Sequence, residues 1–348
     1  MFFTISKEPC SILSEKHTIG GWIISTDSGW RTDSRDGCLI VKKGFANTNC
    51  EIRSDGHDWQ IVTDGIRRFP LWRSDNGDTV SNLHVTGNQI HNPHNPVYVG
   101  GKFQIEQGYR PRNLIANPVD IMLRKTVEER LCDNLVKQVD VLKDIDLPII
   151  APMSKGVDCA LVRATLDYCG VTYASEKISA NTLNKSHLTS HKAFWGYGQM
   201  LDESEPHIQA TGYNGDSYMS RDPLHVSLYL KRWNIDITEE FDKAGNTYMR
   251  NSFDRYYRDY LAGYDYSKTA ELELVDRLLN DFQIWHIDEC FTWTPFADLD
   301  IMRTCLRLDP ETAVDQCVNA GLSRSLIKRL NPKRLDEIQE DHNGNPPI

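Results

Sequence analysis

Two aspartates in this sequence each follow a glycine-containing turn, a setting in which a carboxylate can hold a metal ion beside a phosphate. Asp158 lies in the turn Ser154-Lys-Gly-Val-Asp-Cys159, which follows an apolar run from 147 to 153. Asp216 lies in a second turn, Gln209-Ala-Thr-Gly-Tyr-Asn-Gly-Asp-Ser217. Mg²⁺ takes one or two protein carboxylates and completes its octahedron with phosphate oxygens and water. We therefore predict a magnesium site, the alternative being two ordinary turn aspartates.

The elements around the first turn favour the same chemistry. The run 147–153 is typical of a buried parallel strand, and the apolar spacing from 160 to 168 favours a helix. A strand, a tight turn and a helix direct backbone N–H groups and the positive end of the helix dipole at one point, which suits phosphate. The spacing Gly-x-x-x-x-Gly-Lys of the common nucleotide loop does not occur here. Parallel strands end at one edge of their sheet, so we expect the turns of Asp158 and Asp216 to meet.

The hydrophobic pattern divides the chain into a β-rich domain at 1–118, an α/β domain at 119–340 and a polar tail at 341–348. In the first domain, short apolar runs between turn signals predict an antiparallel sandwich, with strands at 21–25, 38–43, 58–62 and 96–100. In the second, Val127, Leu131, Leu135 and Val139 predict an amphipathic helix within 119–142. A further strand is expected at 171–174, and helices at 224–235, 254–264, 269–285, 298–308 and 313–330.

Composition limits the classes of function. The 348 residues are 40% hydrophobic and 25% charged, as in ordinary globular proteins, and 49 acidic against 39 basic residues leave a net charge of −10. This charge argues against broad nucleic-acid or anionic-membrane binding, although a local basic groove is compatible with it. We find no apolar run of about 18 residues and no signal-peptide pattern, and nine cysteines without a C-x-x-C pair indicate reduced thiols. A cytoplasmic protein is expected.

Four stretches, in order along the chain, resemble the asparagine synthetase/β-lactam synthetase superfamily. The order Ser154-x-Gly-x-Asp-x resembles the pyrophosphate loop Ser-Gly-Gly-x-Asp-Ser of ATP pyrophosphatases. Thr211-Gly-Tyr-Asn-Gly-Asp216 is similar to Thr-Gly-Tyr-Gly-Ala-Asp of β-lactam and carbapenam synthetases and to Ser-Gly-Glu-Gly-Ser-Asp of asparagine synthetase B. Trp293-Thr-Pro-Phe-Ala-Asp-Leu-Asp-Ile-Met302 resembles the family's Pro-Phe-Leu-Asp segment. Ser325-Leu-Ile-Lys-Arg-Leu-Asn-Pro-Lys333 resembles its closing helix, which precedes a catalytic lysine.

The resemblance implies a fold. It implies an α/β domain with a parallel sheet, of the adenine-nucleotide α-hydrolase-like (ATP pyrophosphatase) type, over 119–340. The β-rich segment 1–118 would correspond to the superfamily's Ntn glutaminase-like sandwich. Glutaminase activity there requires a cysteine at the exposed amino terminus, because its free amine acts as the base. This chain begins Met1-Phe2-Phe3 and its first cysteine is Cys10, so the domain is expected to be degenerate and unable to hydrolyse glutamine.

The resemblance also assigns residues. It implies ATP contacts from Ser154, Lys155, Gly156, Val157, Asp158, Cys159, Gly212 and Gly215, and Mg²⁺ ligands at Asp158 and Asp216. Tyr213 and Glu289 would accept the proton of an attacking amine, with Asp288 as an alternative to Glu289. Lys333 would stabilise charge in both chemical steps, with Arg334 as its competitor. The family has glycine and serine where this chain has Lys155 and Cys159, which puts the details of nucleotide binding in question.

The predicted activity is therefore an ATP-dependent, AMP- and pyrophosphate-forming carbon–nitrogen ligase. It would adenylate a small-molecule carboxylate with Mg-ATP and transfer the acyl group to an amine or to ammonia. Two alternatives stay open at this point. One is a pyrophosphate-loop enzyme that modifies a nucleobase or nucleotide, and the other is an inactive nucleotide-binding remnant. Neither substrate is identified by the sequence, and the chain could be a monomer or a homodimer.

Overall fold

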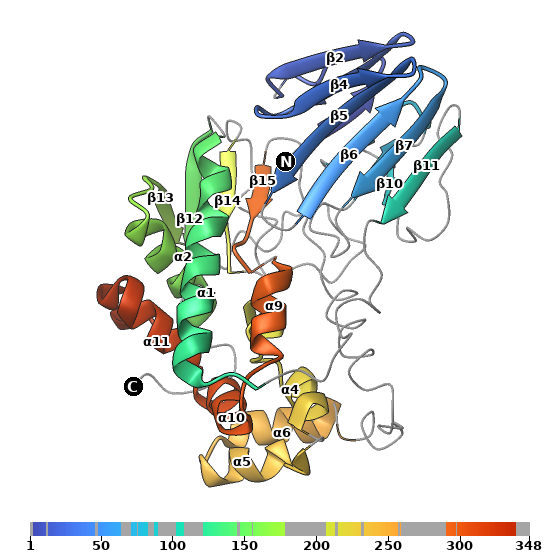
Figure 1. The fold of residues 1–348 in the computed structure, drawn as a ribbon. Coiled ribbons are helices and arrows are strands. Elements are labelled where there is room, and N and C mark those ends of the chain that lie inside the picture. The colour runs from blue at the N-terminus through green and yellow to red at the C-terminus, as the bar shows by residue number, and fades with distance from the viewer. Residues whose placement is uncertain are drawn as a thin grey trace.

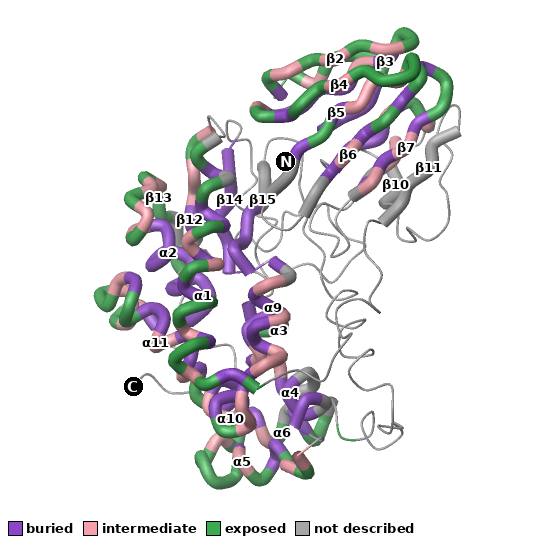
Figure 2. The backbone as a smooth tube through the Cα atoms, viewed as in Figure 1, coloured by how far each residue is buried: buried purple, intermediate pink, exposed green. Residues whose placement is uncertain are grey.

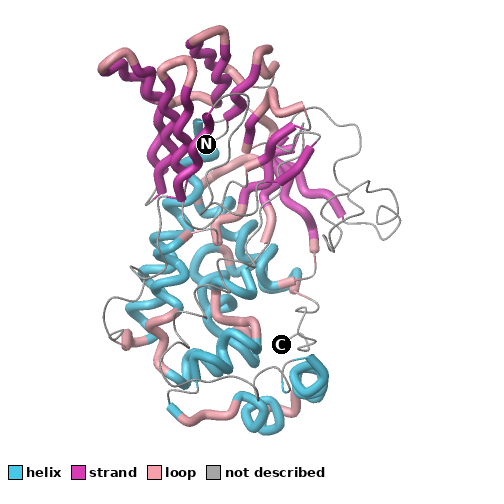
Figure 3. Tube along the Cα trace, turned by 90° about the vertical axis from the view of Figure 1, so that its right-hand side faces the viewer, coloured by secondary structure: helices cyan, strands magenta, loops and turns pink. Residues whose placement is uncertain are grey.

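The chain combines helices with both antiparallel and parallel sheets. A computed structural model describes residues 3–11, 13–45, 48–63, 71–74, 76–82, 87–89, 102–107, 121–144, 147–154, 156–177, 207–212, 215–230, 233–256, 258, 290–296 and 298–338. Figure 1 shows the strands of the amino-terminal part at the top, with the helices α4, α5, α6 and α10 at the opposite end. The view turned by 90° shows the same separation of strands above and helices below (Figure 3). The predicted boundary at 118 and the tail at 341–348 lie outside the described residues.

The amino-terminal part contains two sheets. The six-stranded sheet is antiparallel and has the order β10 (Gly87–Gln89), β8 (Trp72–Ser74), β9 (Val80–Ser81), β1 (Phe3–Ser6), β3 (Trp22–Thr26) and β2 (Glu15–Ile19). The five-stranded sheet has the order β11 (Lys102–Gln107), β7 (Asp58–Thr63), β6 (Thr48–Ser54), β5 (Cys38–Phe45) and β4 (Arg31–Arg35). Its pairs are antiparallel except for β11 with β7.

One hydrophobic cluster joins these two sheets. It contains Phe3, Ile5, Trp22 and Ile24 from the first sheet and Val41, Ile52, Trp59 and Ile61 from the second, all buried. Trp22 and Trp59 meet edge to face across it, with ring centroids 6.0 Å apart. Strands β3, β5 and β7 confirm three of the predicted apolar runs, whereas the fourth, 96–100, lies outside the described residues.

The carboxy-terminal part is built on a four-stranded parallel sheet. Its order is β13 (Ala174–Lys177), β12 (Ile149–Met153), β14 (His207–Ala210) and β15 (Cys290–Trp293), and every pair is parallel. The strand predicted at 171–174 is wrong by three residues. Gly170 and Val171 instead end the preceding helix, their N–H groups donating to the carbonyls of Asp167 and Leu166. The strand therefore begins only at Ala174.

Helix α1 (Arg124–Val139) confirms the predicted amphipathic helix. Val127, Leu131, Leu135 and Val139 are fully buried, and Figure 2 shows buried and exposed residues alternating along it. It packs against α2 (Val157–Tyr168), α9 (Leu299–Cys305) and α11 (Gly321–Leu330). The remaining helices among the described residues are η2 (Asp140–Asp144), α3 (Gly215–Tyr218), α4 (Pro223–Leu230), α5 (Ile237–Lys243), α6 (Thr247–Tyr256), α10 (Pro310–Asn319) and η6 (Pro332–Glu337). No helix in the described ranges is long and apolar enough to cross a lipid bilayer.

Some helix predictions need correction, and one helix was missed. The single helix predicted at 313–330 is two helices, because Ala320 adopts a left-handed conformation (φ 54°, ψ 32°) and its N–H caps α10. The helix predicted at 254–264 begins earlier, at Thr247. Helix α5 was not predicted, although Asp236 caps it by accepting a hydrogen bond from the Thr238 N–H. The helix predicted at 269–285 lies outside the described residues.

Candidate functional site

The sheet order brings the ends of β12 and β14 together. After β12 the chain passes through α2 to β13 on one side, whereas β14 pairs with β12 on the other side. The strand order therefore reverses between β12 and β14, and ligands of open α/β sheets bind at such a point, outside the carboxyl ends of the strands. The turn with Asp158 follows β12 and the turn with Asp216 follows β14.

Helix α2 begins in the first of these turns. Its N-cap is Gly156, with extended backbone angles (φ −82°, ψ 147°), and the Gly156 N–H donates to Ser154 Oγ at 3.3 Å. The first backbone hydrogen bond of the helix runs from the Ala160 N–H to the Gly156 carbonyl. Asp158 lies in the first turn, where a negative charge stabilises the positive end of the helix dipole. Such a helix start can also bind an anionic ligand.

The two turns are in direct contact, and glycines make this contact possible. A Cβ atom at Gly212 would lie 2.6 Å from the nitrogen of Cys159 and 2.7 Å from the carbonyl carbon of Asp158. One at Gly215 would lie 2.6 Å from Cγ of Asp158. The Gly215 N–H donates to the Gly212 carbonyl at 3.1 Å and closes the second turn. The backbone beside Asp216 therefore passes next to the carboxylate of Asp158.

The two aspartates have different surroundings. Asp158 is 8% exposed, and its Oδ1 accepts a hydrogen bond from Nη1 of Arg221 at 2.6 Å. Arg221, which is 1% exposed, comes from the segment that follows Asp216, and its N–H donates to the Asp216 carbonyl at 2.7 Å. Asp216 itself is exposed. One carboxylate is thus buried against a guanidinium, whereas the other belongs to an exposed residue.

The ion pair with Arg221 bears on the magnesium prediction. In the part of the chain that the structure describes, no three or more His, Cys, Asp or Glu side chains are grouped to hold a metal ion. Two carboxylates are nevertheless enough for Mg²⁺ when phosphates and water supply the other ligands. The positive charge of Arg221 beside Asp158 would oppose a second cation there, so a metal at this carboxylate must gain most of its binding energy from the other ligands.

The third motif stretch also reaches this region. The Thr211 N–H donates to the Trp293 carbonyl at 2.9 Å, so the third stretch lies beside the second turn. Within it, Asp298 is buried and caps α9 by accepting from the N–H groups of Asp300 and Ile301. It also accepts a hydrogen bond from Gln138 Nε2 at 2.8 Å. Together these contacts give Asp298 a structural role at the start of α9.

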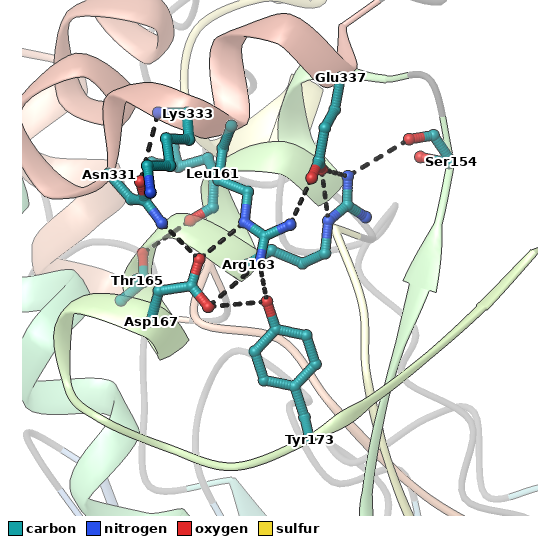
Figure 4. Close-up of polar contacts among 10 residues, drawn as sticks. Ser154, Leu161, Arg163, Thr165, Asp167, Tyr173, Asn331, Lys333 and Glu337 are labelled. Carbon is teal, nitrogen blue, oxygen red and sulfur yellow. Dashed lines mark hydrogen bonds and ion pairs between the residues drawn. The ribbon is translucent and has the colours of Figure 1, made fainter.

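The fourth stretch separates Lys333 from its competitor Arg334. Lys333 is exposed on η6, and its backbone N–H donates to Oδ1 of Asn331 at 3.2 Å. Arg334 binds the carboxylate of Asp167 through Nε at 2.7 Å and Nη2 at 3.2 Å. Figure 4 shows Asp167 beside Asn331 and Tyr173, and it places Arg163 and Glu337, rather than Lys333, beside Ser154. Arg334 thus has a structural role as the partner of Asp167. The catalytic role of Lys333 stays a prediction.

Three of the predicted site residues, Lys155, Tyr213 and Glu289, lie outside the described residues, and so does Asp288. Two buried arginines near the turns, Arg163 and Arg221, were not predicted from the sequence. Arg163 had a recognisable signal, because it interrupts the apolar series Ala160-Leu-Val-Arg-Ala-Thr-Leu166. A charged residue at a core-facing helix position is rare unless it is paired.

Substitution of Gly212 by alanine is expected to lower the free energy of unfolding by about 1–3 kcal/mol, because its new methyl group would overlap backbone atoms of the first turn of α2. Chemical denaturation followed by circular dichroism measures this loss. G215A should also be destabilising, since its methyl group would meet the carboxylate of Asp158, which Arg221 holds in place. Wild-type stability in G212A would show that the two turns can separate without cost.

No model of a known protein family matches the chain, and no curated protein sequence matches it.

Proposed function

We propose that this chain is an Mg-ATP-dependent ligase that adenylates a carboxylate, releases pyrophosphate and transfers the acyl group to an amine or ammonia. The observation that carries the proposal is the contact between the Asp158 turn and the Gly212–Gly215 turn at the reversal of strand order. In this proposal the parallel sheet belongs to an ATP pyrophosphatase-type domain. The two-sheet amino-terminal part would be a degenerate Ntn glutaminase-like domain.

The residues at this edge suit a triphosphate with Mg²⁺. The start of α2 offers backbone N–H groups and the positive end of a dipole, and the exposed Asp216 offers a carboxylate. Ser154 to Cys159 would surround the phosphates, and Asp158 and Asp216 would hold the metal. Glycines at 212 and 215 keep the second turn close to the first. Bound Mg²⁺ would supply positive charge to the phosphate oxygens on which negative charge grows.

The protein's own groups would do little covalent work, and positioning would supply most of the rate enhancement. Lys333 would place a positive charge near the oxygens that gain charge as pyrophosphate leaves. Tyr213 with Glu289 would then accept the proton that the amine loses when it attacks the acyl-adenylate. The roles of Tyr213, Glu289 and Lys333 are carried by the sequence resemblance alone.

A second candidate function is nucleotide binding without turnover, and one observation favours it. Asp158, the predicted metal ligand of the first turn, is already engaged with the buried Arg221. A protein that had lost the reaction would have no need to release this carboxylate for a metal ion. Both candidates predict nucleotide binding, and only the ligase predicts pyrophosphate chemistry.

The test is exchange of labelled pyrophosphate into ATP. This reaction reports adenylation of a carboxylate without requiring the amine, so carboxylates can be tested one by one. We expect exchange that depends on both Mg²⁺ and one class of carboxylate. Nucleotide binding with no exchange for any member of a broad carboxylate panel would reject the ligase and leave the second candidate.

A further inference from the structure

A buried arginine connects the turn after β12 to the carboxy-terminal end of the described chain. Arg163 lies on α2 and is 1% exposed. Its Nε and Nη2 donate to Oε2 of Glu337 at 2.9 and 2.6 Å. The same Nη2 makes a longer hydrogen bond, 3.5 Å, to the carbonyl of Ser154. Figure 4 shows the guanidinium between the two partners.

Glu337 is itself held in place by a second set of contacts. It belongs to η6, and its other oxygen, Oε1, accepts a hydrogen bond from Nη1 of Arg334. Arg334 forms an ion pair with Asp167, which also accepts from Asn331 Nδ2 at 2.7 Å and from the Tyr173 hydroxyl at 2.9 Å. These contacts dock η6 onto α2, so Arg163 meets a carboxylate whose position is fixed.

The ionised carboxylate of Asp167 favours the packing of η6 against α2. Burial by itself would raise the pKa of Asp167, but hydrogen bonds from Arg334, Tyr173 and Asn331 and the charge of Arg334 outweigh it, so the pKa is lowered. Burial and the neighbouring Asp167 raise the pKa of the Tyr173 phenol. The phenol therefore stays protonated, and its hydroxyl donates a hydrogen bond to the carboxylate of Asp167. The carboxylate of Asp167 thus stays ionised while η6 is docked.

We propose that Arg163 is a positioning residue for the turn after β12, and that Glu337 holds Arg163 in the orientation this requires. The guanidinium contacts the Ser154 carbonyl at 3.5 Å, and Ser154 Oγ in turn accepts the Gly156 N–H at the start of α2. Glu337 would therefore control the start of α2 without touching any ligand. A consequence for nucleotide binding rests on the proposed function, whereas the order of the turn itself does not.

The test compares E337Q with D336N in the full-length chain by hydrogen exchange followed by NMR. Both variants remove one negative charge from η6, but Asp336 is exposed and has no part in the proposed linkage. In E337Q we expect the amides of Gly156 and Ala160 to exchange about tenfold faster, because Arg163 loses its charged partner. The amides of Cys169, at the other end of α2, and Ile208, in the sheet, should keep their wild-type rates, and D336N should leave all four unchanged.

Two results would overturn the inference. Rates at Gly156 and Ala160 within about twofold of those in D336N would show that Glu337 does not order the turn. Equal acceleration at Cys169 and Ile208 would show a general structural role instead. R163K provides a second variant, because lysine keeps the charge but lacks the planar fork of donors with which the guanidinium contacts Glu337 and Ser154. It should accelerate Gly156 and Ala160 in the same selective way.

A parallel titration with Mg-ATP separates this inference from the proposed function. If the wild type binds Mg-ATP, E337Q should bind it about tenfold more weakly, while D336N should bind as the wild type does. If the wild type does not bind Mg-ATP, the proposed function fails. The exchange rates would still decide whether Arg163 orders the turn, because they are measured without nucleotide.

Discussion

Replacing Asp158 by alanine should lower the free energy of unfolding by about 3–5 kcal/mol. Its partner Arg221 is 1% exposed, and the two side chains are joined at 2.6 Å. Without the carboxylate, a guanidinium would be left in the interior with its charge less compensated. Denaturant unfolding followed by tryptophan fluorescence measures the loss.

Two further variants test whether the ion pair is the cause. The double variant D158A/R221M should recover much of the stability, since replacing a buried pair by apolar groups is often neutral. R35A removes one partner from the exposed pair of Arg35 with Asp33 and should leave stability unchanged, because exposed ion pairs contribute little. If D158A were as stable as R35A, the burial of the pair would not be important for folding.

Replacing Asp216 by alanine should abolish most of the activity while the fold is retained. Asp216 is exposed, so the change in unfolding free energy should stay within about 0.5 kcal/mol. If Asp216 is a magnesium ligand, exchange of pyrophosphate into ATP should fall by about 100-fold or more, since even groups that only support a metal ligand contribute about 10–100-fold. The same exchange assay that tests the proposed function measures this loss.

A matched control distinguishes the loss of a ligand from the loss of a surface charge. Asp242 is exposed on α5, remote in sequence from both turns, and D242A removes the same charged group. It should keep the wild-type exchange rate. Activity in D216A equal to that in D242A would exclude Asp216 from the metal site. Together with D158A, the variant also separates the two aspartates, because one is expected to affect folding and the other only chemistry.

Local patterns were sufficient to predict several elements. Apolar residues at every fourth position, Val127, Leu131, Leu135 and Val139, predicted α1, because an amphipathic helix buries one apolar stripe. The apolar run after 147 placed β12, and the turn at Ser154 placed the start of α2. The break at Ala320 was missed, because alanine has a high helix propensity and its left-handed conformation depends on how α10 and α11 pack.

Part of the candidate site could also be predicted from the sequence, and part could not. The pairing of the Asp158 turn with the Asp216 turn follows from parallel strands, whose carboxyl ends share one edge, and this could be reasoned from sequence order. The partners of Asp158 and Arg163 could not. Arg221 is 63 residues from Asp158, and Glu337 is 174 residues from Arg163.

The sequence by itself therefore determined several of the elements and the two glycine turns, and it indicated the chemistry that we propose for their aspartates. Only the tertiary structure decided which charges meet, namely Arg221 with Asp158 and Arg163 with Glu337. The physical reason is that hydrophobic periodicity reports which face of an element is buried, without reporting what lies opposite it. A buried charge is stable only beside a partner, and the chain can supply that partner from any distance along its length.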